Sequence, residues 1–211
     1  MGTGADIAKK RFDRICHRKP AGGHFRGWNF RGWKRVVYAL STKRGYRVLP
    51  NQIRILFVCT GNICRSPTAE GVFLHLVQSQ KLDDRISVDS AGTGSWHAGE
   101  APDGRSQKTA LSRGIDISGQ QARSVRGDDF SDFDLIVAMD SSHLHSLRAS
   151  CPTAHLDRLR LFMDYAPETG ITDVPDPYYG AGDGFARVFD MIEAAAEGLL
   201  RDIEANHLGS T

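Results

Sequence analysis

Two residue types that could act together on an oxyanion lie six positions apart in this chain. Cys59 follows an apolar run at residues 53–58, and Arg65 comes just before a helix-like stretch that begins at Pro67. On a strand–helix turn, backbone N–H groups and the helix N-terminus bind anions. The same field favours the thiolate of Cys59, and an arginine can donate two parallel hydrogen bonds to one oxyanion. The pattern predicts a loop that binds an oxyanion and activates a nucleophile.

The residues inside this loop suit a tight turn. We expect Gly61 to adopt a turn conformation that most residues resist, and Asn62 to tolerate the left-handed region of the backbone. We expect Ser66 to cap the helix and Pro67 to occupy its first position. Because a cysteine and an arginine at this spacing also arise by chance, a structural turn with a buried cysteine is the alternative, and the surrounding sequence must decide.

Further segments make the pattern specific. The loop sequence VCTGNICRSP at 58–67 resembles the phosphate-binding loop of low-molecular-weight protein tyrosine phosphatases. The resemblance continues through DSAGT at 89–93, Trp96-His97, APD at 101–103, AMD at 138–140 and VPDPYY at 174–179, and it extends from about residue 53 to about residue 203. Several ordered segments are more specific than one loop, so the resemblance implies a cysteine-dependent phosphatase.

The resemblance implies catalytic roles for Cys59, Arg65 and Asp176. Cys59 would attack phosphorus and form a cysteinyl-phosphate, while Arg65 and the loop N–H groups hold the equatorial oxygens. Asp176 lies between Pro175 and Pro177, which fix the backbone. It would protonate the leaving oxygen and later deprotonate the attacking water. Because Asp-Pro also begins many surface turns, Asp176 taken alone would more often be structural.

Other residues are predicted to shape the site or contact the substrate. By resemblance, Asn62 and Ser90 shape the loop through hydrogen bonds, and Ser66 donates toward the nucleophile. Cys64 either forms a reversible disulfide with Cys59 under oxidants or fills the core as a small hydrophobe. The predicted substrate-binding residues are Thr60, Gly61, Asn62, Ile63, Cys64, Ser66, Trp96, Tyr178 and Tyr179. The three aromatic residues would wall the cleft, with an ordinary surface role as the alternative, above all for Tyr179.

Asp140 and three histidines complete the list of candidates. Asp140 either orients the loop or a charged partner, or caps the helix that follows it. His97, His143 and His145 lack the spacing of metal ligands, so we expect them to be solvated on the surface, and we predict no metal and no cofactor. His143 also departs from the resemblance, because asparagine is common at its position.

Alternating strands and helices must position these residues. The sequence predicts strands over 53–58, 86–89, 134–139 and 159–162, and helices over 67–82, 103–113, 141–149 and 184–206. This alternation predicts a doubly wound, four-stranded parallel sheet with helices on both faces. Ligands of such folds bind at the carboxyl ends of the strands, where Cys59 and Asp140 would both lie.

Charge divides the chain near residue 50. Residues 1–50 hold thirteen Lys and Arg against two Asp and Glu, whereas the remainder holds fourteen against twenty-three. We predict a flexible basic extension over 1–50 and a phosphatase domain over 51–211. The apolar spacing at 33–40 fits a basic amphipathic helix that contacts an anionic membrane or nucleic acid. A disordered tail or a mis-assigned start codon is the alternative.

The composition fits a globular protein of a reducing compartment. A 40% hydrophobic content over 211 residues is enough for one ordinary core. We find no apolar run of membrane-spanning length and no apolar segment of a secretory signal. The four cysteines, two of them in one loop, do not form a disulfide framework. We therefore predict a cytoplasmic protein with no obligate partner.

Several functions fit these residues. We predict a phosphotyrosine phosphatase that acts on phosphotyrosine-bearing proteins, with a bacterial tyrosine kinase as a partner by analogy. A protein arginine phosphatase of the same fold is the main rival, but its members typically carry a small polar residue where Ile63 stands. A thiol-dependent arsenate reductase needs a resolving cysteine pair, which Cys16 and Cys151 do not form. A silent phosphate-binding module would not need an intact nucleophile, arginine and acid.

Overall fold

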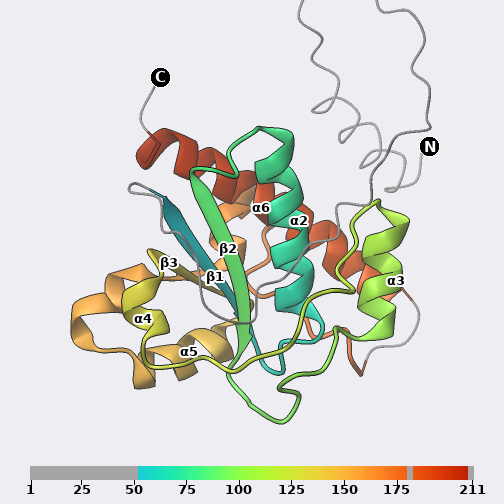
Figure 1. Cartoon of the computed structure of the whole chain (residues 1–211), viewed down its shortest axis with the longest axis horizontal. Helices are drawn as coiled ribbons and strands as arrows, with labels where there is room; N and C mark the ends of the chain where they lie inside the picture. Colours follow the sequence, from blue (N-terminus) through green and yellow to red (C-terminus); the bar gives the residue numbers. More distant parts are fainter. Residues whose placement is uncertain (1–51, 180–182, 209–211) are drawn as a thin grey trace, which may run out of the picture. The chain divides into compact units, whose positions relative to one another are not determined.

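The computed structural model describes residues 52–179 and 183–208, and a four-stranded parallel sheet forms its centre (Figure 1). The strands are β1 (Ile53–Cys59), β2 (Ile86–Gly92), β3 (Leu135–Ala138) and β4 (Leu159–Leu161), in the order β2-β1-β3-β4. All neighbouring strands run parallel, and Ile55 of β1 lies opposite Val88 of β2 and Leu135 of β3. The predicted basic extension and its amphipathic helix lie outside the described residues.

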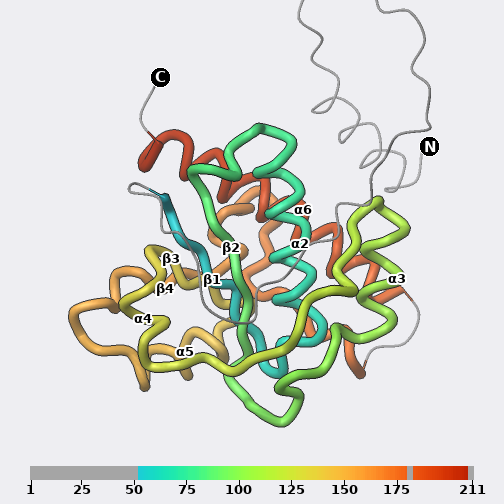
Figure 2. Tube along the Cα trace, in the orientation of Figure 1, coloured from blue at the N-terminus to red at the C-terminus, as the bar shows by residue number. Residues whose placement is uncertain are grey.

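Helices cover both faces of the sheet. α2 (Arg65–Ser79), α3 (Gly104–Ser112) and α6 (Gly184–Asn206) pack on one face, and α4 (Asp129–Asp132) and α5 (Ser141–Ser150) pack on the other. Successive side chains of a strand point to opposite faces, so Ile55 and Phe57 join the first core and Leu56 and Val58 the second. The Cα trace shows α2 and α3 on one side of the strands and α4 and α5 on the other (Figure 2). The predicted doubly wound fold is confirmed.

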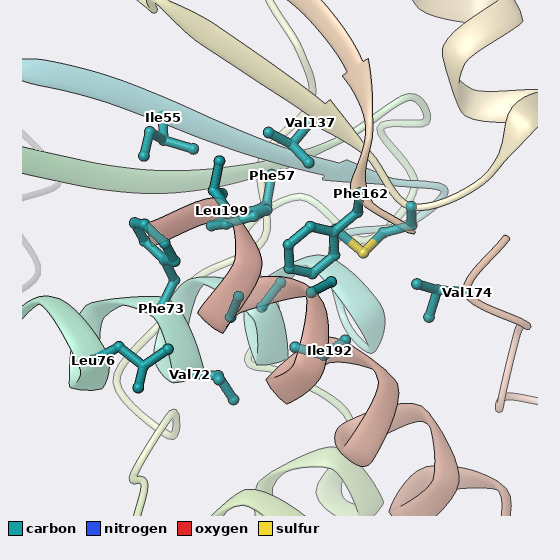
Figure 3. Close-up of a cluster of buried hydrophobic side chains, with 14 of the residues drawn as sticks. Ile55, Phe57, Val72, Phe73, Leu76, Val137, Phe162, Val174, Ile192 and Leu199 are labelled. Carbon is teal, nitrogen blue, oxygen red and sulfur yellow. The ribbon is translucent and has the colours of Figure 1, made fainter. Parts of the chain in front are cut away.

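The larger core anchors the two elements that flank the cysteine loop. Phe57 of β1 lies against Phe73 of α2 and Phe162, with ring centroids 5.7 and 5.1 Å apart. Leu199 of α6 lies in the same cluster, and all these side chains are fully buried (Figure 3). Tilted and edge-on aromatic pairs add to the energy gained from apolar burial. This core holds β1 and α2 in a fixed relation, and therefore fixes the loop between them.

The predicted elements are confirmed with changes at their ends. α2 begins at Arg65 and stops before the predicted end, and β2 continues to Gly92, which pairs with Cys59. Gly114 follows α3 with a φ of 84° and stops the helix, as expected. The short elements have no periodic pattern and were not predicted; they are α4 and the 3-10 turns Thr153–Arg158, Phe162–Tyr165 and Pro167–Thr169. No helix in the described part of the chain is long and apolar enough to cross a bilayer.

Candidate active site

The turn between β1 and α2 places the predicted nucleophile and arginine at the carboxyl end of the sheet. Cys59 is the last residue of β1, and Arg65 is the first residue of α2. Asn62 has a φ of 56°, so it occupies the left-handed region as expected. Cys64 takes the N-cap position without a capping hydrogen bond from its side chain. The N-terminus of α2 therefore retains N–H groups and partial positive charge that can attract an anion.

Cys59 is almost fully buried, and its Sγ lies 3.1 Å from the hydroxyl oxygen of Ser66. The expectation that Ser66 caps α2 was wrong, because Ser66 lies inside the first turn and its hydroxyl faces the sulfur. A hydroxyl can donate a hydrogen bond to a thiolate. The Ser66 hydroxyl therefore lies within hydrogen-bonding distance of the nucleophile's sulfur.

The sulfur lines a cavity of about 170 Å³. The side chains around it come from the loop, from the segment after β2 and from the segment before α6: Cys59, Thr60, Gly61, Ile63, Cys64, Arg65, Trp96, His97, Asp176, Tyr178 and Tyr179. A larger polar cavity of about 720 Å³ lies where β1 and β3 begin, and no cysteine lines it. Chemistry that uses a thiolate therefore belongs to the smaller cavity.

Arg65 is 3% exposed and uses both terminal nitrogens. Its Nη1 donates to Asp140 Oδ2 at 2.6 Å and to the Val174 carbonyl at 3.1 Å. Its Nη2 donates to Asp176 Oδ2 at 2.9 Å and to Thr60 Oγ1 at 3.2 Å. These acceptors come from three separate segments of the chain, so the guanidinium is held in one orientation at the cavity.

Asp176 reaches the cavity from the segment between β4 and α6. One carboxylate oxygen contacts Arg65, and the other accepts a hydrogen bond from the backbone N–H of Tyr178 at 3.0 Å. The side chain is 41% exposed, so it stands between the buried arginine and solvent. Asp176, Arg65 and Cys59 are more than one hundred residues apart at the extremes, and the fold brings them to one cavity.

A buried chain of hydrogen bonds supports the loop from behind. The amide nitrogen of Asn62 donates to Ser66 Oγ at 2.9 Å and to Ser90 Oγ at 2.8 Å. The Ser90 hydroxyl in turn donates to Glu70 Oε2 at 2.6 Å. Burial, and then repulsion from Asp89, raise the pKa of Glu70 to about 8. Asn62 and Ser90 thus hold the turn without lining the cavity.

Sequence reasoning missed Glu70. The one available signal was its position, because a glutamate stands among the apolar residues of α2 rather than on a solvated face. Glu70 of α2 meets Ser90 of β2 because β2 pairs with β1 and lies beside α2. Only the folded chain has this arrangement.

Three aromatic side chains, those of Trp96, Tyr178 and Tyr179, line the cavity, and their contact with a substrate stays a prediction. Trp96 and Tyr179 are mostly exposed, at 66% and 90%, and Tyr178 is 39% exposed. The rings of Tyr178 and Tyr179 meet edge-on, with centroids 5.0 Å apart. Exposed rings beside a buried thiol form an apolar surface that a flat aryl group can contact.

The role expected of Gly61 was wrong. Gly61 is not among the described residues with positive φ, so its backbone does not require glycine. A Cβ atom at this position would lie only 2.8 Å from His97 Cδ2. His97 is correspondingly half-buried at the cavity and pairs with Glu100 at 2.7 Å, rather than standing free in solvent. A larger residue at this position would therefore displace the His97 ring.

His143 also contradicts its prediction as a surface residue, because it is only 3% exposed. Its Nε2 lies 2.7 Å from Thr60 Oγ1. Asp140 both contacts Arg65 and caps α5, since its Oδ1 accepts the His143 backbone N–H at 2.9 Å. The two alternatives for Asp140 are thus both present. The signal for His143 was its position three residues after a capping aspartate, which places both at one helix end.

Cys64 is buried and free, and burial, followed by repulsion from Asp103, raises the pKa of its thiol to about 12. The structure thus has Cys64 as a neutral, buried side chain, although a disulfide with Cys59 under oxidants stays a prediction. No group of three or more metal-binding side chains occurs within residues 52–179 and 183–208.

Comparisons with known proteins point to one family. The model of the family "Low molecular weight phosphotyrosine protein phosphatase" matches residues 54–208. A low molecular weight protein-tyrosine-phosphatase of Streptomyces coelicolor is 46% identical over 150 residues, which cover 70% of this chain and 91% of that protein. A protein tyrosine phosphatase from Entamoeba histolytica has a similar structure, with a TM-score of 0.71 and 40% identity, over 73% of this chain and 98% of that one.

A Drosophila arginine phosphatase also has this fold, with a TM-score of 0.68 and 34% identity over 73% of this chain and 99% of that one. The family match spans most of the chain and includes the cavity residues described above. The resemblance predicted from the motifs is therefore confirmed, and the chain belongs to the low molecular weight phosphotyrosine protein phosphatase family.

Proposed function

We propose that this protein is a protein tyrosine phosphatase that hydrolyses phosphotyrosine monoesters through a cysteinyl-phosphate. The observation that supports this most is the meeting of Cys59, Arg65 and Asp176 at one small cavity beside a helix N-terminus. A thiol, a fixed guanidinium and a carboxyl group are the nucleophile, the anion receptor and the acid that this reaction needs.

In the first step, the Cys59 thiolate attacks phosphorus, a sulfur–phosphorus bond forms and the bond to the aryl oxygen breaks. Asp176 gives its proton to that oxygen, so the leaving group departs as a neutral phenol. Arg65 and the loop N–H groups hold the three equatorial oxygens, over which charge is spread in the transition state. A bound phosphate group competes with Asp176 for Arg65 Nη2, which frees the carboxyl for proton transfer.

In the second step, the Asp176 carboxylate takes a proton from water, which attacks phosphorus as the sulfur–phosphorus bond breaks. Inorganic phosphate leaves, and Cys59 returns as a thiolate. The Ser66 hydroxyl, 3.1 Å from the sulfur, stabilises this leaving thiolate by hydrogen bonding. The same carboxyl group therefore serves as acid and then as base.

The aromatic walls support phosphotyrosine as the substrate. A phenyl ring can pack edge-on or face-on against Trp96 and Tyr178, and the bulky apolar side chain of Ile63 lines the same cavity. Protein arginine phosphatase is the second candidate, because an arginine phosphatase has the same fold. A guanidinium needs polar partners, which Ile63 does not offer.

The position of Cys151 bears on the arsenate reductase alternative. Cys151 ends α5 and does not line the cavity, which argues against its use as a resolving thiol in arsenate reduction. A tyrosine kinase as partner, membrane or nucleic-acid contact through residues 1–50, and a cytoplasmic location are our proposals. The last rests on the reducing conditions that a reactive thiolate needs.

Turnover of the purified full chain on phosphotyrosine, phosphoserine and phosphoarginine peptides tests the proposal, with arsenate reduction assayed in parallel. We expect phosphotyrosine to be hydrolysed at the highest kcat/KM. Cys59→Ser should bind phosphate without turnover, because a hydroxyl is hardly ionised near neutral pH. Preference for phosphoarginine, or turnover in Cys59→Ser, would contradict the substrate or the mechanism respectively.

A further inference from the structure

Four side chains form a closed ring that includes Arg65: Arg65, Asp140, His143 and Thr60. Each contacts the next, and His143 takes no part in the proposed bond-making steps. His143 is almost fully buried. Burial of a polar side chain is costly unless its polar atoms have partners. An apolar side chain would fill the same space without that cost, so the two polar neighbours of the imidazole suggest a role beyond packing.

The distances close the ring. Arg65 Nη1 donates to Asp140 Oδ2 at 2.6 Å, and Arg65 Nη2 donates to Thr60 Oγ1 at 3.2 Å. His143 Nε2 lies 2.7 Å from Thr60 Oγ1, and His143 Nδ1 lies 2.9 Å from Asp140 Oδ1. The last contact is not aligned as a good hydrogen bond, so it is an attraction between the Nδ1–H dipole and the carboxylate. His143 therefore touches two of the acceptors that hold Arg65.

The carboxylate sets the direction of the hydrogen bonds. Burial alone would raise the pKa of Asp140, but hydrogen bonds from His143 and Ser142 outweigh it and hold the pKa below its usual range. An ionised Asp140 favours the proton of His143 on Nδ1, so Nε2 accepts from the Thr60 hydroxyl. The Thr60 oxygen then offers its lone pairs to Arg65 Nη2. Donors and acceptors are consistent around the ring.

We propose that His143 is a positioning residue of the phosphate-binding site, because it fixes the Thr60 hydroxyl and the Asp140 carboxylate that hold the Arg65 guanidinium. This inference rests on the proposed phosphatase function. Bidentate recognition of an oxyanion depends on the plane of the guanidinium. Rotation of that plane weakens binding in the transition state, where the charge is most widely spread.

Substitutions of His143 separate positioning from packing. His143→Leu removes both polar contacts at a similar volume. His143→Gln places an amide near the position of Nε2 and keeps a partner for Thr60, whereas His143→Asn places it near Nδ1 and loses that partner. His145→Leu is the matched control, because His145 lies on the same helix and is exposed.

We expect kcat for p-nitrophenyl phosphate to fall by about 10- to 100-fold in His143→Leu and His143→Asn, the range seen when a residue that orients a ligand group is lost. His143→Gln should recover much of this loss, and His145→Leu should match the wild type. Affinity for inorganic phosphate should follow the same order, which reports the site without turnover. Thermal unfolding shows whether each variant is folded.

Thr60→Val tests the ring from its other side without altering α5. Because part of the effect of His143 on Arg65 passes through Thr60, Thr60→Val combined with His143→Leu should lose clearly less than the sum of the two separate losses in free energy. Additive losses, rescue by asparagine rather than glutamine, or an unaltered Thr60→Val enzyme would overturn the positioning role. Loss of phosphate affinity in the expected order, with no phosphomonoesterase activity in the wild type, would support the ring but contradict the proposed function.

Discussion

At the scale of the single residue, Arg65 concentrates several tasks in one guanidinium. It donates to Asp140, Asp176, Thr60 and the Val174 carbonyl, and so joins the cysteine loop to the segments after β3 and β4. Because its acceptors already orient the guanidinium at the cavity, little reorganisation is needed when an oxyanion replaces one of them. This arrangement makes the shape of the group as important as its charge.

Arg65→Lys should therefore lower kcat/KM by about 100-fold or more, because one ammonium cannot replace a planar fork with two nitrogens in use. Steady-state kinetics on an aryl phosphate measures the loss. Arg126→Lys, at a side chain 70% exposed, serves as the control and should be neutral. Near-normal kinetics in Arg65→Lys would show that Arg65 does not bind the phosphate.

Asp176→Asn should slow aryl phosphates with poor leaving groups by about 100-fold or more and affect activated esters much less. An activated phenolate departs without a proton, so the acid contributes little there. The descending limb of the pH profile should also disappear, because it reports deprotonation of the acid. Kinetics on a series of substituted phenyl phosphates measures both effects.

Equal slowing of all these esters with an unchanged pH profile would make Asp176 structural. The other carboxylates are poorly suited to replace it. Asp140 is paired with Arg65, and Asp173 already accepts hydrogen bonds from the backbone N–H and hydroxyl of Ser141 at 2.9 and 2.8 Å. Neither side chain lines the cavity that Cys59 and Asp176 share, so neither is placed to meet the leaving oxygen.

At the scale of the element, the first turn of α3 links the cysteine loop to the segment that carries Asp176. The backbone N–H of Asp103 donates to the Ile63 carbonyl at 2.8 Å, and the Asp103 side chain pairs with Arg105. Arg105 donates to the Tyr178 carbonyl at 3.1 Å and lies over the rings of Tyr178 and Phe185, 5.0 and 4.6 Å from their centroids. Arg105, in the first turn of α3, therefore contacts both the segment that carries Asp176 and the first turn of α6.

Arg105→Met should lower kcat by about tenfold, because the acid loses part of the contact that positions it, and small misplacements are costly in catalysis. Arg113→Met is a matched control, because Arg113 is the C-cap residue of the same helix. Like Arg105, it pairs with an aspartate, Asp190, and lies over an aromatic ring, that of Phe189. Steady-state kinetics and thermal unfolding compare the two. An equal loss of kcat in both variants would indicate a general effect on packing.

At the scale of the whole molecule, the buried carboxyl of Glu70 couples the site to stability. The pKa of Glu70 is raised from 4.5 to about 8, so the unfolded chain releases this proton at lower pH than the folded chain does. Stability therefore falls as the pH rises from about 4.5 to about 8, by at most about 1.4 kcal/mol per pH unit from this one group. Below that window both states are protonated, and the group contributes no pH dependence.

Glu70→Gln should remove this pH dependence, because an amide resembles the neutral acid and does not titrate. Relative to the wild type, the variant should gain free energy of unfolding as the pH rises from 5 to 8, as urea unfolding at a series of pH values can show. Glu193, whose pKa burial raises to about 7, adds the same slope to both proteins and cancels in the difference. Parallel curves for the two proteins would contradict a titrating Glu70.

The sequence by itself determined the features that are local. The strand–turn–helix pattern around Cys59, the left-handed Asn62 and the periodic strands and helices depend on residues within a few positions of one another. Alternation of these elements was enough for the parallel sheet, and several ordered motifs were enough for the family. Where β2 ended was less predictable, because its last residues are held by pairing with β1.

Only the tertiary structure decided which side chains meet away from the loop. His143 was predicted to lie on the surface, and Glu70 was missed. Burial against segments far along the chain makes His143 a neighbour of Thr60 and Glu70 a partner of Ser90. A side chain at position 61 would likewise displace the His97 ring, a contact that no local sequence pattern records. The physical reason is common to all three: hydrogen bonding, desolvation and steric exclusion act between atoms close in space, whatever their separation in sequence.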